Sequence, residues 1–273
     1  PKLLVINASA FSQGNWNLTD EVYLRKWIDN IPMSQNKLDT VKTIPKNINK
    51  DDEKVKDNIS DTLYFPLEKY HGNWKDPEAV YTSFVTRAYM RLSGGGYLKG
   101  FYSKTGITGG RDNLANIGQP TKEAYVLTDE CRAYLKELLS YCNKLGIEHV
   151  LLLQPPHETQ AADKSGLEQI ESITKEYGYD FLDLSTDYES SVGIDDSHDF
   201  ADFEHLNAYG AQKLSSYIGD MAVNQYGIKS DTAKSELSRW KKSVKRTKKA
   251  LKMAREYTDR GEAQVVGEYE AAK

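Results

Sequence analysis

Residues 147–153 read IEHVLLL, a short and almost wholly apolar run that ends at Gln154-Pro155-Pro156. A run of this length, stopped by turn-forming residues, is typical of a strand buried on both faces of a parallel sheet. KLLVIN at residues 2–7 has the same character, and YDFLDL at residues 179–184 predicts a third strand. We therefore predict two buried strands and a third strand.

Helical periodicity alternates with these strands. Residues 128–145 carry an apolar stripe at three- and four-residue spacing and stop at Gly146, and residues 167–177 stop at Gly178. Glycine directly after a periodic segment is a common helix end. Strand, helix, strand and helix at these spacings predict right-handed crossovers. The fold class we expect is α/β, a doubly wound and mostly parallel sheet with helices on both faces.

Composition limits the functional classes. The chain has 273 residues, 39% of them hydrophobic, and a net charge of -4, which is typical of a globular protein without a nucleic-acid partner. No run of eighteen apolar residues occurs, so no membrane-spanning helix is expected. Cys131 and Cys142 are eleven residues apart on one predicted helix, about 16 Å along its axis, and are expected to be free thiols.

The chain divides into two predicted parts. Residues 1–228 are expected to form the α/β domain, with a helical and loop insertion at about 32–127, and residues 229–273 a basic amphipathic helix and tail. That helix either docks one face on its own domain with its charges in water, the interpretation we favour, or lies on an anionic surface. Within the insertion, residues 64–74 gather aromatics around His71, as a packed segment or as a sugar-stacking surface.

The candidate catalytic residues lie in DFEHLN, residues 202–207, between the third strand and a predicted helix at 208–226. The Asp202 carboxylate, three residues before His205, can hold one ring nitrogen of the imidazole. The other nitrogen is then left to take a proton from a hydroxyl. Asn207 is expected to cap the helix. The competing interpretation is a polar helix start with a surface histidine.

An aspartate-rich segment precedes this motif. Its spacing does not fit the twelve-residue calcium loop, so we predict a solvated loop. No histidine, cysteine or aspartate set shows the spacing of a metal site, and neither metal nor cofactor is expected. The aspartates concerned are Asp187, Asp195, Asp196 and Asp199.

Several of these features together resemble a known family. The strand at 148–153 with Pro-Pro after it, the strand at 179–184, and the motif Asp202-x-x-His205-Leu206-Asn207-x-x-Gly210 are similar to the closing half of an SGNH (GDSL-like) hydrolase domain. The resemblance is to the bacterial subgroup related to D-alanine transfer and polysaccharide O-acetylation proteins. It covers roughly residues 2–226 and leaves out the basic tail.

The resemblance implies a flavodoxin-like three-layer sheet and a serine nucleophile, with His205 as general base and Asp202 orienting it. The family's Gly-Asp-Ser or Gly-Ser-Ser block is not in this chain, and neither is a Gly-x-Ser-x-Gly elbow. The α/β domain is therefore expected to be incomplete at its N-terminus, without its first strand. Three explanations stay open: the serine precedes this chain, Ser9 at the end of the first strand acts instead, or the chain is a non-catalytic relative.

The function we expect is that of a serine-type esterase or O-acyltransferase acting on a cell-surface polysaccharide or a related acyl ester. Asn7 is a candidate oxyanion donor, and His157, His71 and Trp74 are candidate substrate contacts. The alternatives are a non-catalytic carbohydrate-binding or assembly factor that uses the aromatics at 64–74, and an adaptor that binds anionic polymers or membranes through its basic tail.

The resemblance also carries expectations about partners and location. It implies a membrane-bound acyltransferase partner. It further implies an extracytoplasmic protein, at the cell surface or held to the membrane by an N-terminal segment that is not in this chain.

Overall fold

We describe the fold from a computed structural model. The described residues are 1–12, 28, 31, 33–47, 63–64, 75–78, 81, 85, 98, 101–107, 127–156, 164–202, 205–229 and 233–267. The chain forms two compact units, one made of Pro1–Gly14 with Leu92–Lys273 and the other of Asn15–Arg91. The second unit contains α3 (Gln35–Asn47), which lies within the predicted helical and loop insertion. All other elements below belong to the first unit.

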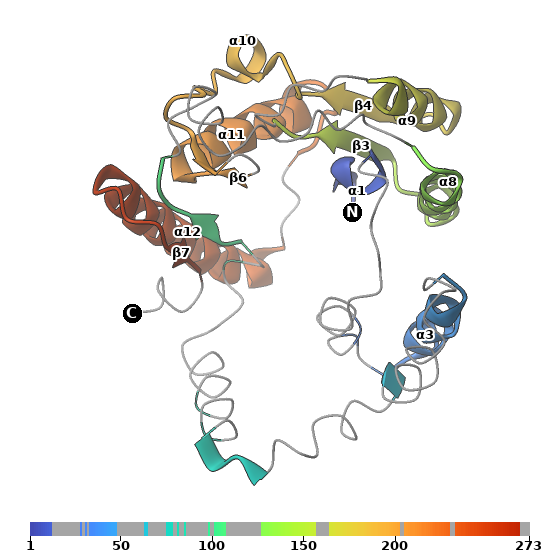
Figure 1. Cartoon of the computed structure of the whole chain (residues 1–273), viewed down its shortest axis with the longest axis horizontal. Coiled ribbons are helices and arrows are strands. Elements are labelled where there is room, and N and C mark those ends of the chain that lie inside the picture. Colours follow the sequence, from blue (N-terminus) through green and yellow to red (C-terminus); the bar gives the residue numbers. More distant parts are fainter. Residues whose placement is uncertain are drawn as a thin grey trace. The chain divides into compact units, whose positions relative to one another are not determined.

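A three-stranded parallel sheet is the centre of the first unit (Figure 1). Its order is β1 (Leu3–Asn7), β3 (His149–Gln154) and β4 (Asp180–Asp183). Leu151 is the register partner of both Val5 on one side and Asp180 on the other. The three predicted strands are confirmed, and the molecule is a mixed α/β structure.

Two helices cover this sheet through the stripes that predict them. In α8 (Asp129–Lys144), Leu135, Leu139 and Cys142 are buried, and Thr128 accepts a hydrogen bond from the Cys131 N–H at 3.2 Å as the N-cap. In α9 (Ser165–Glu176), Leu167, Ile170 and Ile173 are buried. These side chains form one core cluster with Val150 and Leu152 of β3.

One expectation about the strands is wrong. β3 lies between two strands and its residues from Val150 to Gln154 are all buried, but β1 leaves Val5 39% exposed and Asn7 exposed as well. The reason is position: among the described strands β1 pairs with β3 alone, so it is an edge of the described sheet. An apolar run predicts a strand but does not tell a central strand from an edge strand.

Beyond β4 the chain forms α10 (Tyr188–Val192) and a short antiparallel pair, β5 (Phe200–Asp202) with β6 (His205–Leu206). A second buried cluster joins this pair to the sheet. In it, Phe200 and Leu206 pack with Leu153 and Leu184, which lie at the carboxyl ends of β3 and β4. The pair is thereby held at the carboxyl edge of the sheet, where parallel sheets bind ligands.

The C-terminal part returns to the same unit. α11 (Ala208–Asn224) is followed by α12 (Lys234–Asp259), whose Ala250, Ala254 and Thr258 are buried, so the predicted docking of one face is confirmed. β7 (Val265–Val266) then pairs antiparallel with β2 (Ser103–Lys104). Figure 1 shows this two-stranded sheet beside α12. Among the described residues, no helix has the length and apolarity to cross a membrane.

Candidate functional site

Asp202 and His205 form the contact that their spacing predicts. They are register partners of the β5–β6 pair, and His205 Nδ1 lies 2.7 Å from Asp202 Oδ1. The side chains are 33% and 42% exposed, so the pair is fixed on one side and open on the other. An ionised carboxylate only accepts hydrogen bonds, so the proton of a neutral imidazole belongs on Nδ1 here. Nε2 is then the nitrogen that can accept a proton.

Lys104 is a third member of the site, and sequence reasoning missed it. Its Nζ lies 2.9 Å from Asp202 Oδ2 and 3.1 Å from His205 Nδ1. The carboxylate therefore uses one oxygen for the imidazole and the other for the ammonium group. Because the ammonium and Nδ1–H are both donors, the shared acceptor is Asp202. Lys104 fixes that carboxylate and offsets its negative charge.

Lys104 is held by segments that are distant in sequence. It is on β2, where it pairs with Val265 of β7 and forms a parallel bridge with Asn207. The neighbouring Thr105 is almost fully buried, and its Oγ1 donates to the Glu262 carbonyl while accepting from the Gln264 N–H at 2.7 Å. The C-terminal strand thus positions the ammonium group beside the Asp–His pair.

Asn207 does what the sequence predicts and more. Its Oδ1 accepts hydrogen bonds from the N–H groups of Tyr209 at 2.9 Å and Gly210 at 3.3 Å, which caps α11. Its Nδ2 donates to the carbonyls of His198 at 2.6 Å and Gly106 at 3.2 Å. The side chain is fully buried, so these bonds satisfy it where water does not reach. One amide joins the helix start to two other segments.

Gly210, the last residue of the motif, has to be glycine for a steric reason. A Cβ at this position would lie 2.5 Å from the Asp199 carbonyl oxygen and 2.9 Å from Leu206 Cδ2. Only glycine lets α11 approach the Asp199 backbone this closely. That approach also lets the Asn207 N–H donate to the same Asp199 carbonyl at 2.8 Å.

Asp199 corrects the expectation of a solvated aspartate loop. It is fully buried, and three partners compensate its charge there. Its carboxylate accepts hydrogen bonds from the Asp195 N–H at 2.8 Å and from Lys213 Nζ at 2.6 Å, and it pairs with His198 Nδ1 at 2.9 Å. Burial alone would raise the pKa of this carboxyl, but the three partners outweigh it and the pKa is lowered. The composition of an aspartate-rich segment does not show which of its aspartates is buried.

Of the other predicted site residues, the structure describes Asn7 and Ser9. At the carboxyl end of β1, Asn7 Oδ1 accepts the Ser9 N–H at 2.8 Å, a turn that starts α1 (Ser9–Ser12). The Ser9 hydroxyl is 3.4 Å from Nε2 of the buried Gln154. The described polar contacts of the His205 ring are to Asp202 and Lys104, and none is to Ser9. His71, Trp74 and His157 lie outside the described residues.

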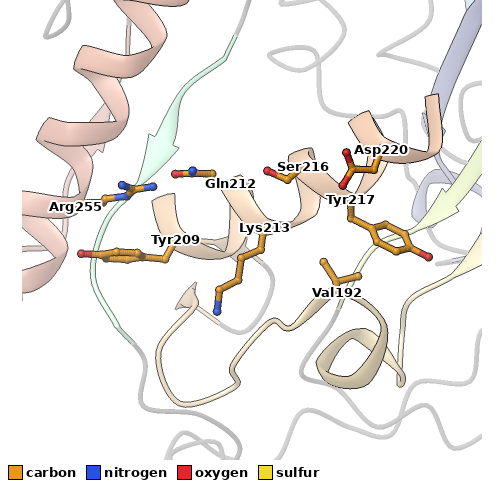
Figure 2. A pocket seen from close by; sticks show the side chains of 8 residues that line it. All are labelled: Val192, Tyr209, Gln212, Lys213, Ser216, Tyr217, Asp220 and Arg255. Carbon is orange, nitrogen blue, oxygen red and sulfur yellow. The ribbon is translucent and has the colours of Figure 1, made fainter. Parts of the chain in front are cut away.

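A hollow of about 450 Å³ opens along α11, starting four residues after His205. Six of its lining residues are on α11, and Figure 2 shows their side chains together with Val192 from α10 and Arg255 from α12. The Arg255 guanidinium lies 5.0 Å from the centroid of the Tyr209 ring, and the Tyr209 hydroxyl donates to Asp259 at 2.8 Å. The hydrogen bond to Asp259, together with burial, raises the pKa of Tyr209. The lining combines two tyrosine rings with amide, hydroxyl and charged groups.

Within the described residues, no three histidine, cysteine, aspartate or glutamate side chains are grouped so as to hold a metal ion. Both cysteines are free, as their spacing predicts, and burial raises the pKa of the Cys142 thiol. Comparison with protein-family models, with curated proteins and with solved structures finds no match to this chain.

Proposed function

We propose that Asp202 and His205 are the acid and base of a serine-type esterase or O-acyltransferase of the SGNH kind. The observation that carries the proposal is the 2.7 Å contact between Asp202 Oδ1 and His205 Nδ1. It orients a half-exposed imidazole whose Nε2 can accept a proton. The doubly wound fold with helices on both faces belongs to the same proposal, and the parallel order β1-β3-β4 supports it.

The proposed reaction passes an acyl group through the enzyme in two steps. A serine hydroxyl gives its proton to His205 Nε2 while its oxygen bonds to the ester carbonyl carbon. The alcohol then leaves with that proton and an acyl-serine remains. Water, or a hydroxyl of a sugar, next loses a proton to Nε2 and attacks the acyl carbon. The serine oxygen then leaves with that proton, which restores the serine hydroxyl and the neutral imidazole. Asp202 stays ionised throughout and stabilises the imidazolium.

Two sources of the serine fit this chemistry. Ser9 lies at the carboxyl end of β1, on the sheet edge where the family resemblance expects substrate. The other source is a serine on an additional strand, outside this chain, that pairs along the outer edge of β1. The open edge of β1 among the described strands and the 39% exposure of Val5 support this second source. Asn7 would then contribute its amide to the oxyanion.

The substrate class we propose is an acyl ester on a polysaccharide. The hollow along α11 supports it, because tyrosine rings beside amide and hydroxyl groups suit the faces and hydroxyls of sugars. The same hollow favours the second candidate function, a non-catalytic carbohydrate-binding factor. Binding of acetylated xylan separates the two. A binding factor loses the polymer with Tyr217→Ala and has no turnover that His205→Ala could remove.

The test of catalysis is hydrolysis of 4-nitrophenyl acetate, with labelling by a fluorophosphonate that reacts with activated serines. We expect His205→Ala to lower the rate at least a hundredfold and to abolish labelling. The matched control is His149→Ala, because His149 lies at the amino end of β3, away from the pair. Ser9→Ala in the same assay tests Ser9 directly, and a serine on an additional strand is tested with a form of the protein that carries that strand. Equal rates for His205→Ala and the unchanged protein would refute the catalytic proposal.

A further inference from the structure

We propose that the N-terminal part of α12 is a docking surface for a bilayer that contains anionic phospholipid. This proposal does not depend on the esterase proposal, because it uses no residue of the Asp–His site. It rests on the charge, the exposed apolar side chains and the burial pattern of this one helix.

The charge of this helix is unlike that of the rest of the chain. Residues 234–255 hold ten Lys and Arg and one acidic residue, Glu236. This segment of charge +9 belongs to a chain of net charge -4, which leaves -13 for the remainder. The positive charge is therefore gathered on one element, so a negatively charged surface attracts α12 while it repels the rest of the molecule.

The same helix exposes apolar side chains in a row. Leu237, Trp240 and Val244 are spaced three and four residues apart and are 44%, 42% and 51% exposed. At this spacing they lie on one face of the helix. The fully packed residues of α12 are Ser243, Ala250, Ala254 and Thr258, and three of these four lie in its C-terminal half, beyond the apolar row. Three large apolar side chains are thus presented to solvent on a helix that is already packed.

Lysines follow the apolar row. Lys241 is four residues after Leu237, and Lys248 is four residues after Val244, with Lys245 between them. Leu237 itself lines a hollow of about 440 Å³ with several of these cations. None of these three lysines forms an ion pair with a described carboxylate. The other lining residues are Lys234, Ser238, Lys241, Lys242 and Lys245.

This arrangement favours a bilayer over a soluble polyanion. A polyanion neutralises the lysines but leaves Leu237, Trp240 and Val244 in water. At a bilayer the ammonium groups reach the phosphates, while the apolar row enters the boundary of the acyl chains. Tryptophan is enriched at that depth because its ring is apolar and its N–H is polar. The helix therefore has the side chains for both layers of the interface.

The experiment is co-sedimentation of the full chain with large vesicles, either of phosphatidylcholine alone or with one third phosphatidylglycerol. We expect binding to the anionic vesicles at 50 mM salt that weakens at 500 mM, and at least tenfold weaker binding to neutral vesicles. Lys241→Gln, Lys245→Gln and Lys248→Gln combined should weaken binding at least tenfold, since a lysine near an anionic surface contributes about 1 kcal/mol. Glutamine is a good helix former, so α12 is kept.

The matched control is Lys136→Gln, Lys144→Gln and Lys229→Gln combined, three exposed lysines elsewhere with the same change in net charge. This variant should bind as the unchanged chain does. Quenching by brominated lipid locates the helix: Trp240→Phe should lose the quenching signal and keep binding, because phenylalanine retains the apolar row. Hydrolysis of a soluble aryl ester should be the same in all these variants, so failure here is distinct from failure of the esterase proposal.

Three outcomes would overturn the docking proposal. The first is equal loss of binding in both lysine triples, which would indicate net charge alone. The second is anionic binding without quenching that depends on Trp240. The third is binding to soluble polyphosphate but not to anionic vesicles, which would make the surface a polyanion site.

Discussion

Lys104 shows what one residue outside the motif adds to the Asp–His pair. Asp202 and His205 are three residues apart, so their contact can be expected from a local motif. Lys104 is 98 residues away from Asp202 in sequence and reaches it through the pairing of β2 and β7. Nothing near Lys104 in the sequence marks it. The Asp202–His205 contact was therefore predictable from the local sequence, whereas the contact of Lys104 with Asp202 was not.

We expect Lys104→Met to lower kcat of the proposed esterase about fivefold with little change in KM, since a half-exposed ion pair is worth about 1 kcal/mol. The reason is that Asp202 loses the donor on Oδ2 and holds the imidazole less firmly. Lys164→Met is the matched control, because Lys164 pairs with Asp183 at similar exposure and touches neither member of the pair. Steady-state kinetics of both variants measure kcat and KM. An equal loss of kcat in the two variants would contradict the positioning role of Lys104.

Asp199 allows a prediction about pH. Its pKa is lowered in the folded protein, so the unfolded chain takes up the proton first as the pH falls. Its contribution is therefore complete above the unfolded pKa of about 3.9 and is lost as the pH falls through the lower folded value. Asp199→Asn should cost about 2 kcal/mol at pH 7, where Lys213 loses its counter-charge, and less at pH 3, below the unfolded pKa. Urea unfolding at both pH values measures this, and a cost that is independent of pH would contradict it.

At the scale of elements, long apolar runs were predictable and short strands were not. The runs at residues 2–7, 147–153 and 179–184 each form a strand, because short runs of this kind between turn-forming residues favour strands over helices. β5, β6 and β7 have two or three residues each, too few for any periodicity. They form because their partners are brought to them by the rest of the fold.

Two glycines of α11 test how closely this helix packs. Gly210→Ala should destabilise the protein by about 2 kcal/mol, since its Cβ would meet the Asp199 carbonyl oxygen at 2.5 Å and backbone cannot yield cheaply. Gly219→Ala on the same helix has nothing within 4 Å and should stabilise by about 0.5–1 kcal/mol through helix propensity. Thermal unfolding of both variants is the measurement. Two changes of the same sign would contradict the close approach.

At the scale of the whole molecule, the chain's last strand supports a site formed by its middle. β7 pairs with β2, β2 carries Lys104, and Lys104 contacts Asp202. The sequence divides at residue 228 by composition, because the tail is basic. The structure nevertheless puts Pro1–Gly14 and Leu92–Lys273 in one compact unit. The basic composition of the tail reflects its exposed side chains. The tail is held in this unit by buried residues such as Ala250, Ala254 and Val266.

This coupling predicts different outcomes for two adjacent valines of β7. Val266 is fully buried and Val265 is 53% exposed, so Val266→Ala should cost about 2 kcal/mol and Val265→Ala less than about 0.5 kcal/mol. Loosening β7 also releases β2, so Val266→Ala should speed hydrogen exchange at the Thr105 N–H, which donates to Gln264 O at 2.9 Å. Exchange should stay unchanged in β3, because β3 pairs with β1 and β4 and not with β7. If Val266→Ala speeds exchange in β2 and β3 alike, β7 stabilises the unit as a whole. If β2 alone responds, β7 acts locally, through the strand that carries Lys104 to the Asp–His pair.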